Sequence, residues 1–217
     1  DLYFERYFDK PRHIEIQVLC DNHGNAVHLG ERDCSLQRRN QKVIEETTAV
    51  NIPREQINKI GNICTNACKK LGYTGAGTFE FLYQDGGFSF IEMNTRIQVE
   101  HPVSEFLTGI DIISQQILVA SNEKLKFRQE DISFNGHSIE CRINAEDPVT
   151  FIPSPGHISL FHPPGGPGVR IDSHIYSGYD VPPNYDSLIA KIVTHAENRE
   201  LAIKKMLFAL DETVIQG

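Results

Sequence analysis

Two glutamates, Glu80 and Glu92, have the type and spacing to hold a cation. They lie in two segments rich in hydrophobic residues, 77–83 and 88–94, which are separated by turn residues and therefore predict a hairpin. If the loop is the three residues 85–87, the two glutamates lie directly opposite each other on one face. Carboxylates that face each other among hydrophobic neighbours repel unless a cation compensates their charge. Magnesium usually binds one or two carboxylates together with phosphate oxygens, so the pattern indicates a magnesium ion that a nucleotide also binds. The alternative is that either glutamate pairs with a nearby arginine.

The residues that follow place a polar side chain at every second position, and these are Glu92, Asn94, Arg96, Gln98 and Glu100. In an extended chain they share one side. Such a row offers a metal ligand, a guanidinium for a small oxyanion and a carboxylate base. His101 has the more convenient pKa for a base, but it points to the other side and precedes Pro102. Glu100 is therefore the predicted base.

A basic cluster lies within residues 31–42 and consists of Arg32, Arg38, Arg39 and Lys42. Opposite a site of carboxylates and metal, these side chains could hold phosphate. The equally simple alternative is a solvated basic face.

Composition restricts the class of protein. The 217 residues are 40% hydrophobic and 23% charged, which excludes a disordered chain. The net charge of -8 argues against broad binding to nucleic acid or to anionic membranes, and no apolar run reaches the length of a membrane helix. Five cysteines without a C-x-x-C pair indicate neither a disulfide framework nor a zinc knuckle, so we expect a soluble protein of a reducing cytoplasm. The chain lacks an initiator Met and opens inside a hydrophobic segment, which predicts a fragment of a longer protein.

Hydrophobic periodicity predicts the elements that position these residues. We expect a hairpin of segments 12–19 and 26–29, a helix over about 57–71 closed by Gly72, a helix over about 104–120, strands near 137–143, 157–161 and 169–172, and a last helix after Asn198. Cys64 and Cys68 fall on the apolar stripe of the first helix, which favours core packing over metal binding. The polar stretch 121–135 predicts a boundary between two units.

Six segments together resemble the biotin carboxylase family of ATP-grasp enzymes, and they are 11–17, 31–35, 37–42, 79–81, 92–102 and 140–148. The run 92–102 is the most specific of them. The second unit, including 151–156 and 182–187, looks most like the biotin carboxylase subunit of bacterial acetyl-CoA carboxylase. The resemblance implies an α+β fold. The distal part of an ATP-grasp domain, an antiparallel sheet with helices, would occupy 1–134, and a biotin carboxylase C-terminal domain, incomplete at its end, would occupy 135–217. The family's N-terminal domain and glycine-rich lid are expected outside this chain.

The resemblance also implies roles for individual residues. The ligands of catalytic magnesium or manganese, two ions in all, would be Glu80, Glu92 and Asn94. Bicarbonate would be held by Lys42, Arg96, Gln98 and the backbone of Val99. Glu100 would deprotonate it, and Arg142 with Arg96 would hold the ureido oxygen of biotin. The nucleotide would contact Glu5, Arg6, Tyr7, Phe8, His13, Gln37, Asn40 and Leu82. Asn40 departs from the histidine that is usual there.

The implied reaction is ATP-dependent formation of carboxyphosphate from bicarbonate, followed by carboxylation of biotin N1 on a carrier protein. This would be the first half-reaction of acetyl-CoA carboxylase in fatty acid synthesis, with the fragment alone inactive. The implied partners are a biotin carboxyl carrier protein, carboxyltransferase subunits and a second copy of the full-length protein in a homodimer. Neither nucleic acid nor membrane is expected as a partner.

Three alternatives stand beside this hypothesis. The chain could be a non-catalytic module that binds nucleotide weakly or serves assembly. It could belong to another ATP-grasp ligase such as a carbamoyl-phosphate synthetase, which would not be expected to carry the polar row 96–100 or the segment around Arg142. Arg142 itself could form a structural salt bridge to Glu140 or Glu146 instead of binding biotin.

Overall fold

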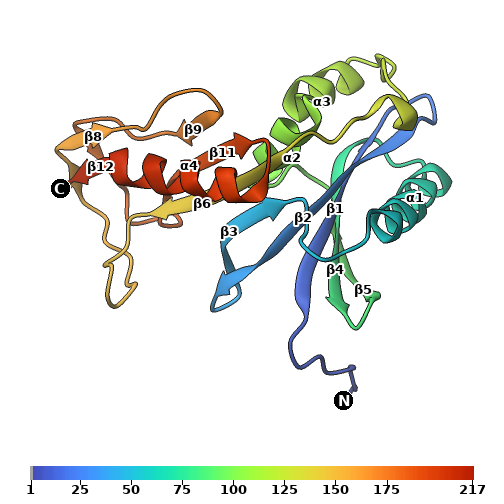
Figure 1. Ribbon diagram of the computed structural model, residues 1–217, viewed down its shortest axis with the longest axis horizontal. Coiled ribbons are helices and arrows are strands. Elements are labelled where there is room, and N and C mark those ends of the chain that lie inside the picture. Colours follow the sequence, from blue (N-terminus) through green and yellow to red (C-terminus); the bar gives the residue numbers. More distant parts are fainter. Residues whose placement is uncertain (1) are drawn as a thin grey trace. The chain divides into compact units, whose positions relative to one another are not determined.

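The computed structural model describes residues 2–217, which divide into two compact units (Figure 1). The first unit runs to Ser35 and resumes over Thr47–Phe134, and the second comprises Leu36–Glu46 and Asn135–Gly217. The hairpin at 36–46 thus groups with the residues that follow Phe134. The first unit combines an antiparallel sheet with several helices and the second combines antiparallel sheets with one helix, which confirms the predicted α+β class.

The sheet of the first unit has the order β5-β4-β1-β2. Its strands are β1 (Arg12–Cys20), β2 (Ala26–Arg38, which enters the second unit at Leu36), β4 (Gly75–Gln84) and β5 (Gly87–Asn94). All neighbours are antiparallel. Both predicted hairpins are confirmed, although β2 extends well beyond the expected end at residue 29.

The helix α1 (Arg54–Leu71) covers one face of this sheet (Figure 1). Alternate residues of β1 such as Ile14 and Ile16 pack with Cys64 and Cys68 of the helix in one buried core. The helix ends at Gly72, whose φ of 65° is the left-handed conformation that glycine adopts most easily. Both the helix and the core role of its two cysteines are confirmed. All five cysteines lie in the described part of the chain, where they are buried and form no disulfide.

The prediction of one helix over 104–120 is wrong, because the structure has two. They are α2 (His101–Thr108) and α3 (Ile112–Ala120). Gly109 ends α2 with a φ of 71°, and the side chain of Asp111 caps α3 by accepting from the backbone of Ser114. A left-handed glycine followed by an N-cap aspartate interrupts an otherwise continuous apolar pattern. A short 3-10 helix, Gln129–Asp131, follows later in the unit.

Among residues 2–217 no single helix is long and apolar enough to cross a membrane. The helices α2 and α3 meet such a test only as a pair, and that pair is bent by 97°.

The larger sheet of the second unit has the order β3-β6-β11-β9. Its strands are β3 (Gln41–Thr47, in this unit up to Glu46), β6 (His137–Asn144), β11 (Leu188–Ala196) and β9 (Val169–Ser173). The helix α4 (Arg199–Glu212) packs against β6 and β11. Two small sheets pair β7 (His157–Ile158) with β10 (Tyr179–Asp180) and β8 (Leu160–His162) with β12 (Val214–Gln216). The last helix and the strands near 137 and 169 are confirmed. The single strand expected over 157–161 is wrong, because Ser159 separates β7 from β8 and the two pair in different sheets. The strands β3, β10, β11 and β12 were not predicted.

One carboxylate, Glu46 at the end of β3, ties together two other elements of the second unit. Its Oε2 lies 2.8 Å from Nε2 of His137 in β6 and accepts from Nε of Arg199 in α4 at 2.6 Å. Burial alone would raise the pKa of Glu46, but these two partners outweigh it and lower the pKa from 4.5 to about 2. Glu46 therefore stabilises the folded unit in its ionised form.

We predict that Glu46→Gln lowers the free energy of unfolding by about 2 kcal/mol at neutral pH, since charge-assisted hydrogen bonds are lost. Because the folded pKa of Glu46 is depressed, its contribution is present above pH 4.5 and disappears as the pH falls toward about 2. The difference between wild type and variant should shrink over that window in denaturant titrations of the full-length protein. Glu200→Gln, which removes an exposed pair with Lys204, should change little at any pH. An equal loss at every pH would contradict the assignment.

Candidate active site

One face of the sheet in the first unit carries the predicted metal ligands. Glu80 of β4 lies between Glu15 of β1 and Glu92 of β5, directly opposite both. Asn94 Nδ2 donates to Glu80 Oε1 at 2.9 Å and to Glu92 Oε1 at 3.1 Å. The structure therefore brings Glu80, Glu92 and Asn94 together.

Glu80 and Glu92 pair as predicted, but the turn and the strand register that bring them together differ from the prediction. The turn has two central residues, Asp85 and Gly86, with φ of 53° and 79°, and not three. A bulge at Ile91 in β5 then shifts the register by one residue. The shorter turn and the extra residue compensate, so the two carboxylates still face each other.

The oxygen-rich donor set of this cluster suits a hard divalent cation. Two carboxylates and an amide offer oxygen ligands of the kind that magnesium prefers. Gln98 Nε2 also donates to Glu80 Oε1 at 2.7 Å, so two amide groups compensate the paired negative charges. Rotation of the Asn94 amide would present its oxygen to an ion. Glu80 is buried and Glu92 is exposed, so the cluster opens at one side.

His13 belongs to the same face. Its Nε2 lies 2.8 Å from Glu80 Oε2 and 3.3 Å from Glu15 Oε1, and Leu82 of β4 pairs with it across the strands. Burial alone would lower the pKa of His13, but the two carboxylates outweigh burial and raise it to about 9. At neutral pH the face therefore carries a cation beside Glu80. The atoms of His13, Glu15 and Glu80 also lie close enough together to share a metal ion.

The expectation of an extended polar row from Glu92 to Glu100 is wrong beyond Asn94. The strand ends there, and residues 95–100 form an irregular segment that leads into α2. Proline in the first turn of α2 suits a helix start, because its missing N–H needs no partner there. As a result Arg96 is exposed and Val99 is half-buried, whereas Gln98 and Glu100 are buried.

These two buried residues meet a fully buried arginine. Arg32 of β2 donates from Nη2 to Gln98 Oε1 at 2.8 Å, and its Nη2 lies 2.9 Å from Glu15 Oε2. Burial would lower the pKa of Arg32, but the negative charges of Glu15 and Glu100 raise it above its usual value. Glu100 is thus buried beside Arg32, while the sequence had placed it beside Arg96.

His101, the rival candidate for the base, is engaged elsewhere. Its Nδ1 lies 2.8 Å from the backbone oxygen of Gln98, and its Nε2 lies 3.9 Å from Glu105. The ring therefore closes the turn at the start of α2. This arrangement agrees with the preference for Glu100, whose role stays a prediction.

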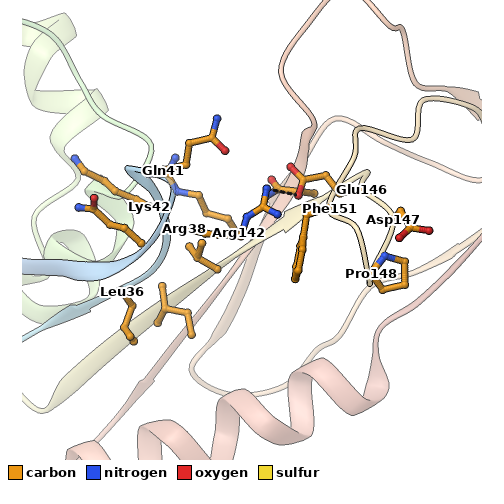
Figure 2. Close-up of a pocket in the computed structure, with 13 residues that line it drawn as sticks. Leu36, Arg38, Gln41, Lys42, Arg142, Glu146, Asp147, Pro148 and Phe151 are labelled. Atoms are coloured by element: carbon orange, nitrogen blue, oxygen red, sulfur yellow. Dashed lines mark ion pairs between the residues drawn. The ribbon is translucent and has the colours of Figure 1, made fainter.

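The second unit contains a cavity of about 540 Å³ that holds further predicted residues. Lys42 of β3, Arg142 of β6 and Arg38 line it (Figure 2). Gln37 lines it as well. The structure therefore places the predicted bicarbonate lysine and the predicted biotin arginine on the walls of one cavity. Asn40 is exposed in the turn between β2 and β3, with a φ of 63°, and does not line this cavity.

The partner of Arg142 was not foreseen. Its Nε donates to Glu45 Oε1 at 2.6 Å, and Glu45 is fully buried in β3. Neither of the two predicted partners takes the place of Glu45. Glu140 is buried elsewhere on β6, and Glu146 pairs with Arg38 at 3.4 Å. Glu45 fixes one edge of the guanidinium while the side chain still borders the cavity.

The predicted basic cluster also needs correction. Arg32 cannot belong to an exposed basic surface, because its side chain has no accessible area. Arg38 stacks over the ring of Phe151 at 4.2 Å, and Arg39 is exposed in a turn. Of the four residues, Arg38 and Lys42 are the two that line the cavity.

The segment 5–8, which is predicted to contact the nucleotide, precedes β1 and is irregular. Glu5, Arg6 and Tyr7 are exposed and Phe8 is half-buried, with the Arg6 guanidinium 4.9 Å from the Phe8 ring centre. These residues keep their nucleotide role as a prediction.

Two family models match the chain. Residues 1–128 match the family described as carbamoyl-phosphate synthase L chain, ATP binding domain, and residues 140–217 match the family described as biotin carboxylase C-terminal domain. Among curated relatives, a protein named biotin carboxylase from Allochromatium vinosum is 63% identical over 100% of this chain and 48% of its own length. The chain spans about half the length of the curated relatives it matches.

Solved structures agree with these matches. A biotin carboxylase of Campylobacter jejuni, in a complex with a β,γ-ATP compound, has a TM-score of 0.95 and 55% identity over 98% of this chain and 48% of its own. The biotin carboxylase domain dimer of Hydrogenobacter thermophilus 2-oxoglutarate carboxylase has a TM-score of 0.96 and 51% identity, with the same coverage. That structure contains MgADP, ADP and bicarbonate.

We predict that Asn94→Asp destabilises the full-length protein without divalent ions, because a third carboxylate replaces the amide that donates to Glu80 and Glu92. Added magnesium should raise the thermal midpoint of this variant more than that of wild type. The matched control is Asn62→Asp, which adds the same charge at an exposed position of α1. Equal magnesium shifts for wild type and both variants would argue against a metal site here.

Proposed function

The chain belongs to the biotin carboxylase family of ATP-grasp enzymes, and we propose that the full-length protein carboxylates biotin on a carrier protein with ATP and bicarbonate. The observation that carries the proposal is the cluster of Glu80, Glu92 and Asn94 with Gln98 and buried Glu100 behind it. This cluster combines a magnesium site with a polar wall for a small oxyanion. The matched C-terminal domain at 140–217 favours biotin chemistry over carbamoyl-phosphate synthesis.

In this proposal the nucleotide lies over the polar face of the first sheet. Glu80, Glu92 and Asn94 hold magnesium, or manganese, which neutralises phosphate charge during transfer. His13, held between Glu15 and Glu80 on the same face, would contact the ribose or the phosphates. Further nucleotide contacts come from Glu5, Arg6, Tyr7, Phe8, Gln37, Asn40 and Leu82.

Bicarbonate is held by Arg96, Gln98, Lys42 and the backbone of Val99, and Glu100 removes its proton. Bicarbonate is a weak nucleophile, so orienting it beside a base and the γ-phosphate accounts for much of the acceleration. The product of this step is carboxyphosphate. Glu100 suits the role of base because it is buried beside Gln98, whereas His101 is engaged with the backbone of that residue.

Biotin is proposed to bind through its ureido oxygen to Arg142 and Arg96. As N1 gains electron density the ureido oxygen gains negative charge, which a guanidinium stabilises. The contact from Glu45 fixes Arg142 and so reduces the entropy lost on binding.

For the parent system we propose acetyl-CoA carboxylase in fatty acid synthesis, located in the cytoplasm. Its partners would be a biotin carboxyl carrier protein and carboxyltransferase subunits, and the full-length protein would form a homodimer. The resemblance of segments 151–156 and 182–187 to the biotin carboxylase subunit of bacterial acetyl-CoA carboxylase supports this parent system. The competing proposal is that the parent enzyme carboxylates 2-oxoglutarate, as the name of one structural relative indicates.

The full-length protein should release ADP from ATP only when bicarbonate is present, and free biotin should accelerate that release. Measurement of ADP with and without bicarbonate and biotin tests this expectation. Replacement of biotin by ammonia or glutamine serves as the control for a carbamoyl-phosphate reaction. The proposal would be refuted if the rate of ADP release did not depend on bicarbonate, or if ammonia but not biotin increased it.

We predict that Glu100→Gln in the full-length protein abolishes bicarbonate-dependent ATP cleavage while ATP binding survives, because the base is lost but the nucleotide face remains. His101→Asn, which leaves Glu100 in place, should reduce the rate much less. Initial rates and nucleotide binding of both variants test the ranking. If His101→Asn proved the more damaging change, the base would have to be reassigned.

A further inference from the structure

Arg32 was predicted to belong to a basic cluster, but in the structure it is hydrogen-bonded in the polar interior of the first unit. Its side chain is fully buried and donates to five side chains, namely Glu15, Gln17, Thr78, Gln98 and Ser104. These acceptors come from β1, β4, α2 and the irregular segment before α2. A guanidinium has five N–H donors in a rigid plane, so such a set of acceptors holds it in one orientation.

The contact with Gln98 fixes which way that amide points. Arginine can only donate, so the oxygen of Gln98 must face Arg32, at 2.8 Å. The amide nitrogen is thereby directed to the opposite side, where it donates to Glu80 Oε1 at 2.7 Å. A rotated amide would present N–H to a cation and oxygen to a carboxylate, so both neighbours select the same orientation.

The two neighbours of the Gln98 amide differ once a metal binds. Glu80 is a proposed metal ligand, and an ion would compete with the amide for its oxygen. Arg32 does not bind cations and has no such competitor. Its contact therefore remains to orient Gln98 when the site is loaded.

We propose that Arg32 is a positioning residue for bicarbonate, which acts by holding the Gln98 amide with its N–H group turned toward the substrate. The inference rests on the proposed function and extends it to a residue outside the substrate site. Arg32 touches neither nucleotide nor bicarbonate in this proposal. Its loss should weaken bicarbonate binding selectively.

A matched control exists in the same unit. Arg54 donates two hydrogen bonds to the fully buried Glu31, at 2.6 and 2.7 Å, and neither residue contacts Gln98 in any hydrogen bond of the described structure. Arg54→Lys therefore breaks a pair of arginine and buried carboxylate without touching the amide, with the difference that the Arg54 side chain is 36% exposed. It reports the cost of losing such a pair for stability alone.

The test compares Arg32→Lys and Arg54→Lys in the full-length protein, with KM for bicarbonate and for ATP measured in the bicarbonate-dependent reaction. Lysine keeps the charge but not the fork of donors, so Arg32→Lys should raise KM for bicarbonate about tenfold and leave KM for ATP unchanged. Arg54→Lys should lower the thermal midpoint without changing either KM. The stabilisation of each protein by bicarbonate in thermal unfolding gives a readout that does not depend on turnover.

A gentler pair of variants keeps the arginine and covers the case in which Arg32→Lys fails to fold. Thr78 Oγ1 accepts from the same Nη2 that binds Gln98, at 3.1 Å. Thr78→Val removes this acceptor and should raise KM for bicarbonate about twofold to threefold, whereas Thr78→Ser keeps the hydroxyl and should restore the wild-type value.

Suppose that the wild-type protein is active. If KM for bicarbonate is then unchanged in folded Arg32→Lys, or in Thr78→Val, the positioning role is overturned and the proposed function stays intact. Wild-type protein without bicarbonate-dependent cleavage would instead overturn the proposed function. In that case an unchanged bicarbonate thermal shift in Thr78→Val would also refute the role of Arg32.

Discussion

The polar half of the first unit depends on the burial of one guanidinium. Removing a charge from water is costly unless it is paired and fully hydrogen-bonded, and Arg32 meets this condition with one carboxylate and four neutral acceptors. These acceptors belong to β1, β4, α2 and the segment between β5 and α2. The charge of Arg32 therefore fixes how that segment folds back over the sheet, which in turn sets where Gln98 and Glu100 lie.

The sheet separates its two tasks by the two-residue period of its strands. In β1 the even-numbered Ile14 and Ile16 pack under α1, while the odd-numbered His13 and Glu15 line the other face. The apolar face supplies the burial that stabilises the unit. Closely spaced like charges, such as Glu80 beside Glu92, cost free energy on the polar face. The burial on the opposite face compensates this cost.

Periodicity could predict the two hairpins and α1, because each depends on neighbours in sequence, but it reached the facing pair Glu80 and Glu92 through a three-residue loop that the structure does not have. It could not predict the two-residue turn or the bulge in β5, whose effects cancel in the final register. It misplaced Arg32 because neighbouring basic residues suggested a surface, whereas its acceptors lie 15 to 72 positions away in the chain. It also missed β11, because buried polar residues such as Lys191 and Thr194 interrupt its apolar residues, which leaves neither a regular alternation nor a continuous apolar run.

The location of Glu100 beside Arg32 bears on how a buried carboxylate could act as a base. Ionised Glu100 and ionised Glu15 both stabilise the guanidinium. When Glu100 takes a proton, Arg32 loses one of these two charges but keeps Glu15 and its four neutral acceptors. Proton uptake thus need not leave an unpaired buried cation, which is the usual penalty for neutralising one member of a buried pair. Glu15, which contacts no substrate in this proposal, would then be the carboxylate that still pairs with Arg32 while Glu100, the proposed base, holds the proton.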